Sequence, residues 1–231
     1  MTRANKRWGW LLDLSPNQNE GITLWLLDED GRRHQLRQDF PVTFYAAGEN
    51  GQLREAWRHL KSQPIPVSLS RTERRDLFAG MLTVMAVEVK NPADQPRLFA
   101  ALSHQFPHLT YYDSDLQLSL RHAAAHGTFP LARCVVTTDD INWIRSINVL
   151  DSPWDTELIV PPLRAITLEP DVDPSHAEPR TLNVQTPGER FSMDLSMPQR
   201  ALLINLQAAL MRHDPDLLLT AHGDTWLLPR L

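Results

Sequence analysis

The chain has little cysteine and no long apolar segment. A single cysteine, Cys134, among 231 residues excludes an internal disulfide, and its place in the strand-like segment LARCVVTT indicates a buried structural thiol rather than a nucleophile. No apolar run reaches the roughly 18 residues that a membrane helix needs, and the segment MTRANKRWGW has no small-residue cleavage site after an apolar stretch. We therefore expect a cytoplasmic protein with no membrane contact.

An excess of charge of one sign is also missing. The formal net charge of -5 at pH 7 argues against a protein that coats nucleic acid with its whole surface, although it leaves room for a local basic groove. Because 42% of the residues are hydrophobic, a chain of this length can bury a substantial core in one or two domains.

What is present is a series of strand patterns followed by alternating strand and helix patterns. Residues 8–47 alternate as in a β-meander, with a hairpin turn at Asp30-Gly31, where both residues tolerate positive φ. Residues 53–62 have helical spacing, the short strand PVSLS and the charged segment RTERRD follow, and MLTVMAVEV is a long apolar strand. This order predicts a mixed α/β fold of the α+β kind.

From Val87 the pattern is strand, helix, strand, helix. Pro92 and Pro96 open the first helix, and Gly127 closes the second. Residues 1–149 are therefore predicted to form one domain, a β-meander packed beside a βαβα segment.

Residues 150–162 show no periodicity and contain several prolines, which is typical of a linker. The second domain is expected over 163–231, as a strand, a hairpin across the turn TPGE, a helix and a further strand. That helix is predicted to be capped by Ser196 and to face the core with four leucines, which are Leu202, Leu203, Leu206 and Leu210. This order of strand, hairpin, helix and strand is the one with which a ribonuclease-H-like fold begins, and the assignment rests on that analogy.

Three segments, taken in order, resemble family B DNA polymerases, and the bacterial DNA polymerase II branch most of all. WLLDL followed by TLWLLDEDGRRHQLRQDFPVTFYA resembles the opening sheet of that family. In the middle stretch, Tyr112 and Asp115 fit a Y-x-x-D strand, and Arg121 falls at the arginine of the next helix. PPLRAITLEPD and HDPDLLLTAHGDTWLLPRL resemble the regions that carry the first two exonuclease motifs.

The resemblance implies a modular enzyme, in which an amino-terminal domain that contacts single-stranded template precedes a 3′-to-5′ exonuclease and the polymerase domains. Because no part of this sequence corresponds to the palm, fingers or thumb, we do not expect the chain alone to make DNA. Its implied partners are template and primer-template DNA and the remaining polymerase domains. Mg²⁺ is implied for the parent polymerase, and this chain is expected to require no cofactor.

The resemblance also implies a metal site, because exonucleases of this kind use two divalent cations held by carboxylates. The first motif is D-x-E, and Glu169 and Asp171 occupy its positions in reversed order, on one face of a strand. In the second motif, Leu227 stands where a carboxylate ligand is expected, and Asp224 is a nearby acid. We expect a degenerate exonuclease, and the alternative for these acids is a solvated loop after a core strand.

Four arginines are candidates for DNA phosphates, namely Arg71, Arg74, Arg75 and Arg121. For the first three, a solvated face interleaved with acids is an equally good interpretation. Five aromatic residues can stack on unpaired bases or fill the core, namely Trp8, Trp10, Tyr45, Tyr111 and Tyr112. His122 and His126 lie one helical turn apart without a third metal ligand.

These features favour a non-catalytic piece of a DNA polymerase that binds template and contributes architecture. A free-standing nucleic-acid-binding or interaction module built from the same domains is the alternative. An active nuclease ranks third, because Leu227 cannot ligate a metal.

Overall fold

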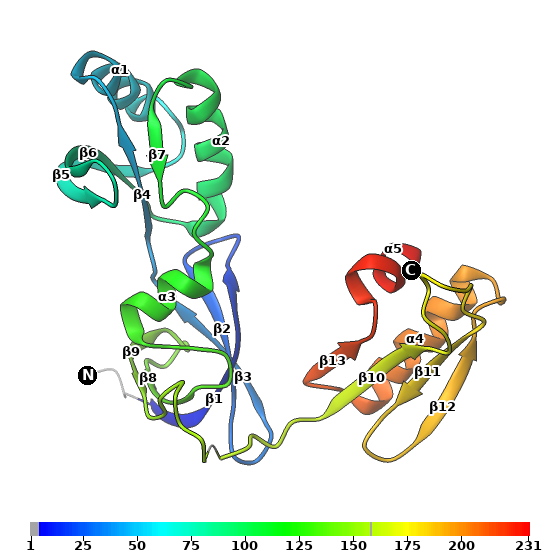
Figure 1. Ribbon diagram of the computed structural model, residues 1–231. Helices are drawn as coiled ribbons and strands as arrows, with labels where there is room; N and C mark the ends of the chain where they lie inside the picture. Colours follow the sequence, from blue (N-terminus) through cyan, green and yellow to red (C-terminus); the bar gives the residue numbers. More distant parts are fainter. Residues whose placement is uncertain (1–4, 158) are drawn as a thin grey trace. The chain divides into compact units, whose positions relative to one another are not determined.

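The computed structural model describes residues 5–157 and 159–231 and divides the chain into two compact units, Met1–Pro161 and Pro162–Leu231. Unit 1 contains two antiparallel sheets, and unit 2 contains a third, mixed sheet (Figure 1). The expected mixed α/β fold is therefore confirmed. Among the described residues, no helix has both the length and the apolar character needed to cross a bilayer.

Sheet A has five strands, all antiparallel to their neighbours. In spatial order they are β3 (Arg33–Gln38), β2 (Ile22–Leu27), β1 (Asn5–Pro16), β8 (Arg133–Thr138) and β9 (Ile144–Val149). The first three form the predicted meander, since alternating residues such as Leu24 and Leu36 turn into the core. Cys134 is fully buried there, as its apolar neighbours indicated.

Sheet B belongs to a βαββαβ segment, in which two helices cover one face of a four-stranded sheet. Its elements along the chain are β4 (Val42–Ala47), α1 (Asn50–Lys61), β5 (Val67–Asp76), β6 (Gly80–Val89), the 3₁₀ turn η1 (Pro92–Asp94), α2 (Gln95–Gln105) and β7 (Thr110–Tyr112). The spatial order is β5-β6-β4-β7, and every neighbouring pair is antiparallel.

Two expectations for this region need correction. The fourth strand of the predicted meander, β4, leaves sheet A and becomes a central strand of sheet B. The segment RTERRD is not separate from the preceding strand, because it continues β5 and pairs with β6 as far as Asp76 opposite Gly80. Alternation fixes which face a side chain takes but not which strand is its neighbour.

α3 (Leu118–His126) follows sheet B and ends at Gly127, whose φ of 71° is the left-handed conformation of a helix C-cap. His122 on this helix is fully buried. Its Nε2 lies 2.9 Å from Oε1 of Gln38, and its Nδ1 lies 2.6 Å from the hydroxyl of Thr128. A neutral ring satisfies both partners, so these histidines serve packing and hydrogen bonding rather than metal binding.

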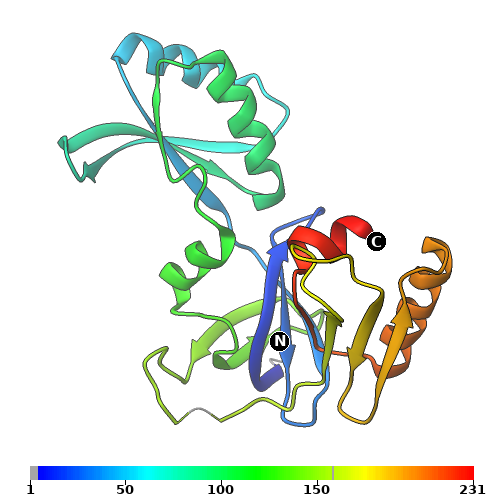
Figure 2. The same ribbon diagram turned by 45° about the vertical axis from the view of Figure 1, so that its right-hand side comes forward.

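Unit 2 is built on sheet C, covered on one face by α4 (Gln199–His213) (Figure 2). Its strands in spatial order are β12 (Arg190–Asp194), β11 (Thr181–Gln185), β10 (Ala165–Pro170) and β13 (Leu217–Thr220). β10 and β13 are parallel, and the other neighbours are antiparallel. The π-helical turn η2 (Gly223–Leu227) and the short helix α5 (Leu228–Arg230) follow β13.

The helix α4 differs from expectation at two points. Pro198, not Ser196, is its N-cap residue, and no side chain caps it. Leu202 and Leu206 are buried as expected, and Leu210 packs half-buried against the same core beside the buried Ala209, whereas Leu203 is 40% exposed. The inward stripe is therefore narrower than the four leucines indicated, because Leu203 lies about 100° around the helix from Leu202.

The buried histidine makes unit 1 sensitive to acid. Burial, and next the neighbouring His126, lower the pKa of His122 from 6.5 to about 4. Between pH 6.5 and about pH 4, His122 is protonated in the unfolded chain but stays neutral in the folded chain. The contribution of His122 to folding stability is therefore fully present above pH 6.5 and is lost as the pH falls to about 4. We expect this group to remove about 2 kcal/mol between pH 7 and pH 5.

Urea denaturation at several pH values measures this loss. His122→Gln should flatten the dependence between pH 7 and pH 5, whereas His104→Gln, which changes an exposed histidine, should leave it intact. An equal pH dependence in the His122→Gln variant would contradict the assignment.

Candidate functional site

The face of sheet B that α1 and α2 leave uncovered carries two tyrosines side by side. Phe44 and Ala46 of β4 point into the helix-covered core, so Tyr45 between them points to the opposite side, called here the outer face. Tyr45 is paired with Tyr112 on β7 and with Ala86 on β6. Both tyrosines are half-buried, and their rings stand on strands that the core holds in register.

Arg74 lies against this tyrosine pair. Its guanidinium is 4.9 Å from the centre of the Tyr45 ring, and Nη2 donates to the Tyr45 hydroxyl at 3.1 Å. The Tyr112 hydroxyl is bonded to Asp76, and burial together with this bond raises the pKa of Tyr112. Together with Leu82 and Val84 these side chains line a small cavity of about 130 Å³. That volume admits little more than one planar ring, well below an ordinary small-molecule pocket.

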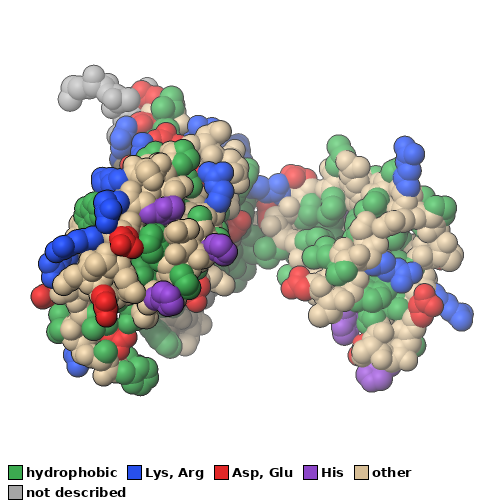
Figure 3. Space-filling model, turned by 90° about the horizontal axis from the view of Figure 1, so that it is seen from above, with side chains coloured by type: hydrophobic (Ala, Val, Ile, Leu, Met, Phe, Trp, Pro, Cys, Tyr) green, Lys and Arg blue, Asp and Glu red, His purple; other side chains and the backbone are tan. Residues whose placement is uncertain are grey.

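The four candidate arginines do not form one cluster. Along β5, residues 71 and 75 turn to the helix side, while Arg74 turns to the outer face, because successive side chains alternate. Arg75 also borders the outer-face cavity, and Arg71 lies beside Met85. Figure 3 shows lysines and arginines interspersed with acids on one face of the molecule.

Arg121 is used within the fold. Its guanidinium donates to the backbone carbonyls of Thr43, Leu116 and Asp113, the first at 2.7 Å and the second at 3.0 Å. These bonds tie α3 to β4 and to the segment after β7. Few donors remain for a phosphate, so the geometry favours a structural role for this arginine.

The other aromatic candidates divide between core and surface. Tyr111 faces the core, where its hydroxyl donates to the carbonyls of Leu102 and Phe106. Trp10 is 4% exposed, whereas Trp8 is 51% exposed and lies under the Lys6 ammonium. Only Tyr45 and Tyr112 among the five share the outer face with a cation.

In unit 2, the two acids of the first exonuclease-like motif share one face, as their spacing predicted. Ile166 and Leu168 of β10 are buried in the core, so Glu169 and the following Asp171 project from the alternate positions and are exposed. Glu169 is paired with Asn183 of β11. Asp171 accepts a hydrogen bond from the Arg180 amide at 3.0 Å. Although burial would raise the pKa of Asp171, the backbone bonds from Arg180 and Thr181 lower it.

These acids have no third ligand beside them. Asp224 on η2 is exposed, and nowhere in residues 5–157 and 159–231 do three His, Cys, Asp or Glu side chains converge in a metal-binding arrangement. Leu227 is fully buried in the core of unit 2 with Leu168 and Leu206. The donor set therefore does not fit a pair of divalent cations, which need several converging oxygen ligands.

The sequence interpretation missed the arginines of α1. Arg54 and Arg58 border a groove beside Trp57, on the opposite side of sheet B from Tyr45. These arginines could have been found from the spacing of residues 50, 53, 54, 57 and 58, which places all five on one face of a helix. Asp76, the partner of Tyr112, was also missed, because nothing in the sequence shows that the two strands are close.

The buried leucine of the second motif gives a direct test. Leu227→Asp introduces the carboxylate that the resemblance implies at this position, yet it places that carboxylate in the core, and we expect it to cost about 4 kcal/mol of folding stability. Leu228→Asp is the matched control, because Leu228 is 52% exposed. Chemical denaturation of both variants measures the difference. A Leu227→Asp protein that stays as stable as the parent and is further stabilised by Mg²⁺ would contradict this account.

Comparison with known proteins gives a clear similarity to solved structures. No family model and no curated protein matches the chain. A solved structure described as the family B DNA polymerase from the hyperthermophilic archaeon Pyrobaculum calidifontis aligns with a TM-score of 0.67 and 21% sequence identity. The alignment covers 97% of this chain and 31% of the polymerase. The chain thus has the fold of about a third of a family B DNA polymerase, and this archaeal neighbour gives no support to the bacterial DNA polymerase II branch.

Proposed function

We propose that this chain is the template-contacting front portion of a family B DNA polymerase, followed by the opening of a degenerate 3′-to-5′ exonuclease domain. The fold similarity over 97% of the chain is the main support. The expected partners are single-stranded template, primer-template DNA and the remaining domains of the parent polymerase. Nucleotide transfer and its Mg²⁺ belong, in this proposal, to those remaining domains.

The outer face of sheet B is the proposed contact for single-stranded DNA. Four-stranded sheets of βαββαβ segments commonly bind single strands by stacking bases on aromatic residues. Tyr45 and Tyr112 supply such rings, and Arg74 supplies a cation for an adjacent phosphate. Asp76 and Asp113 border the same cavity, so phosphates are expected to pass on the Arg74 side. Arg75 turns to the helix side of β5, so it is left out of this contact, and Arg121 holds α3 against β4 through its bonds to backbone carbonyls.

The exonuclease part is proposed to be structural. Glu169 and Asp171 are retained at the ancestral metal positions, with Asp224 as a third acid nearby in sequence, but Leu227 occupies the core. Without converging carboxylates, hydrolysis of a phosphodiester has no means of activating water.

A free-standing nucleic-acid-binding module is the second candidate. It is favoured by one observation, that every residue of the tyrosine and arginine site lies within unit 1 and needs no other domain. The natural reading frame after Leu231 separates the two proposals, since a polymerase requires palm, fingers and thumb segments there.

Binding of fluorescent oligo-dT, followed by anisotropy, tests the outer face. Because one stacked base contributes about 1–3 kcal/mol, Tyr45→Leu should weaken binding by about tenfold. Arg74→Gln should also reduce the slope of log K against log salt by about 0.7, the value for one phosphate of a single strand.

Arg32→Gln is the control for these variants, because Arg32 is exposed and pairs with the exposed Asp30. Affinity that stays at the parent value in both outer-face variants would rule out this surface.

The exonuclease proposal has its own test. A labelled primer incubated with the chain and Mg²⁺ or Mn²⁺ should remain intact at its 3′ end, as followed on a sequencing gel. Degradation that disappears in the Glu169→Ala variant would show that the site works.

A further inference from the structure

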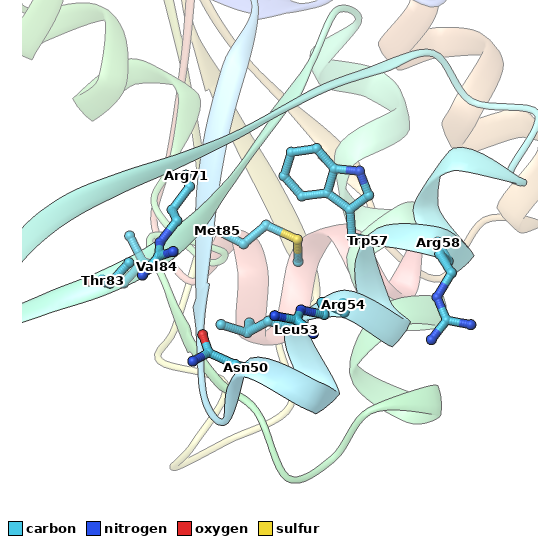
Figure 4. Close-up of a pocket in the computed structure, with 9 residues that line it drawn as sticks. All are labelled: Asn50, Leu53, Arg54, Trp57, Arg58, Arg71, Thr83, Val84 and Met85. Atoms are coloured by element: carbon cyan, nitrogen blue, oxygen red, sulfur yellow. The ribbon is translucent and has the colours of Figure 1, made fainter.

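A groove on the helix side of sheet B is distinct from the outer face. It lies where the β5–β6 hairpin extends past α1, and its volume is about 530 Å³ (Figure 4). This volume falls within the range of about 300–1,000 Å³ found for small-molecule sites. The groove is lined by Asn50, Leu53, Arg54, Trp57, Arg58, Arg71, Thr83, Val84 and Met85.

The floor of the groove is apolar and includes one large aromatic ring. Leu53 and Trp57 are half-buried against the core of unit 1, and Met85 of β6 is 3% exposed between them and the sheet. Figure 4 shows the Trp57 indole and the Met85 sulfur facing the same space. The core beneath holds the ring in place, so little side-chain entropy is lost when a planar ligand stacks on it.

The rim of the groove is cationic. Arg54 and Arg58 come from α1 and Arg71 comes from β5, and no Asp or Glu lines the groove. Within the described part of the chain, none of these three guanidinium groups has a hydrogen-bond or ion-pair partner. They differ in this from Arg74, which is bonded to Tyr45. In a protein of net charge -5, such an unneutralised group of three guanidiniums attracts anions.

The lining also contains polar side chains of intermediate size. Asn50 and Thr83 each offer a donor and an acceptor at the groove. An aromatic ring for stacking, an amide and a hydroxyl for a base edge, and guanidiniums for phosphates together match the chemistry of a nucleotide. Inorganic phosphate alone would leave the apolar floor unused, and an apolar ligand would leave the guanidiniums unused.

A protein partner fits less well. A stable peptide or protein interface buries about 1,200 Å² or more in total, over a broad surface. Here the apolar area is confined to Leu53, Trp57 and Met85 within a single concave groove. β5 is an edge strand, but its charged residues Arg71, Glu73 and Arg75 discourage the addition of another strand.

We propose that this groove binds a nucleotide, with its base stacked on Trp57 and its phosphates held by Arg54 and Arg71. Arg58 adds charge at the outer end of the groove, where Figure 4 shows it pointing away from Trp57. The site lies on the opposite side of sheet B from Tyr45 and Tyr112, so nucleotide binding in the groove can be tested separately from DNA binding on the outer face. The nucleotide is either free in solution or part of a single strand.

Isothermal titration of the whole chain with dATP tests the site. The double variant Arg54→Gln/Arg71→Gln alters only exposed side chains and should weaken dATP binding by about tenfold or more, because charge-assisted bonds are lost. Trp57→Leu should weaken it by about fivefold or more through the lost stacking. Tripolyphosphate, which has no base, should bind more weakly than dATP.

The matched controls are Arg32→Gln and Trp154→Leu, which change an exposed arginine and an 88% exposed tryptophan elsewhere, and both should bind dATP normally. The same titrations with oligo-dT identify the source. If the groove variants lose affinity for both probes, the nucleotide belongs to a strand, and if they lose affinity only for dATP, it is free.

The proposal would be overturned by no binding of dATP at millimolar concentration, by equal affinity in the parent and in the double variant, or by tripolyphosphate binding as tightly as dATP. Binding of a leucine-containing oligoglutamate in place of dATP would also overturn it and indicate an acidic protein partner. Tyr45→Leu separates the two sites, because it should change oligo-dT binding at the outer face and leave dATP binding unchanged.

Discussion

The register of the sheets is the constraint on which the candidate sites depend. Side chains alternate along a strand, so a slip of one residue would exchange every inward side chain for an outward one. In sheet B the pairing of β5 with β6 places Arg71 beside Met85 on the helix side and Arg74 beside Leu82 on the outer face. The buried side chains, among them Phe44 and Val87, hold that register. The polar residues of both faces therefore have positions that the hydrophobic core determines.

Local patterns were enough to locate most elements, because each depends on residues close in sequence. The three meander strands of sheet A, the αL cap at Gly127 and the shared face of Glu169 and Asp171 followed from periodicity or from backbone chemistry. The predictions that were wrong concern strand pairing between segments far apart in the sequence. No local pattern shows that β4 leaves sheet A or that RTERRD pairs with β6. The strand β9 was missed because the apolar residues of its sequence, IRSINV, do not alternate regularly, and the strand is stabilised by pairing with β8.

In the segment that resembles the second exonuclease motif, a hydrophobic core and a metal site would need the same position. Converging carboxylates repel each other and must be solvated or neutralised by a cation. A buried leucine instead adds apolar contacts, and Leu227 packs with side chains from β10 and α4. With this residue inside the core, unit 2 needs no cation to offset charge at that point. Asp171 accepts a hydrogen bond from the Arg180 amide, so this carboxylate is stabilised without a cation.

The two arginine sites of sheet B differ in what a ligand must displace. On the outer face, a base can stack on Tyr45 only after the Arg74 guanidinium leaves the ring, and an exposed cation–π contact costs about 0.5–1 kcal/mol to break. Stacking of a base on Tyr45 contributes about 1–3 kcal/mol of binding free energy, and the Arg74 guanidinium that has left the ring can then pair with a phosphate. Net binding there is consequently modest, and its strength depends on salt. In the groove beside Trp57 the guanidiniums have no described partner to leave, so an incoming phosphate competes only with water.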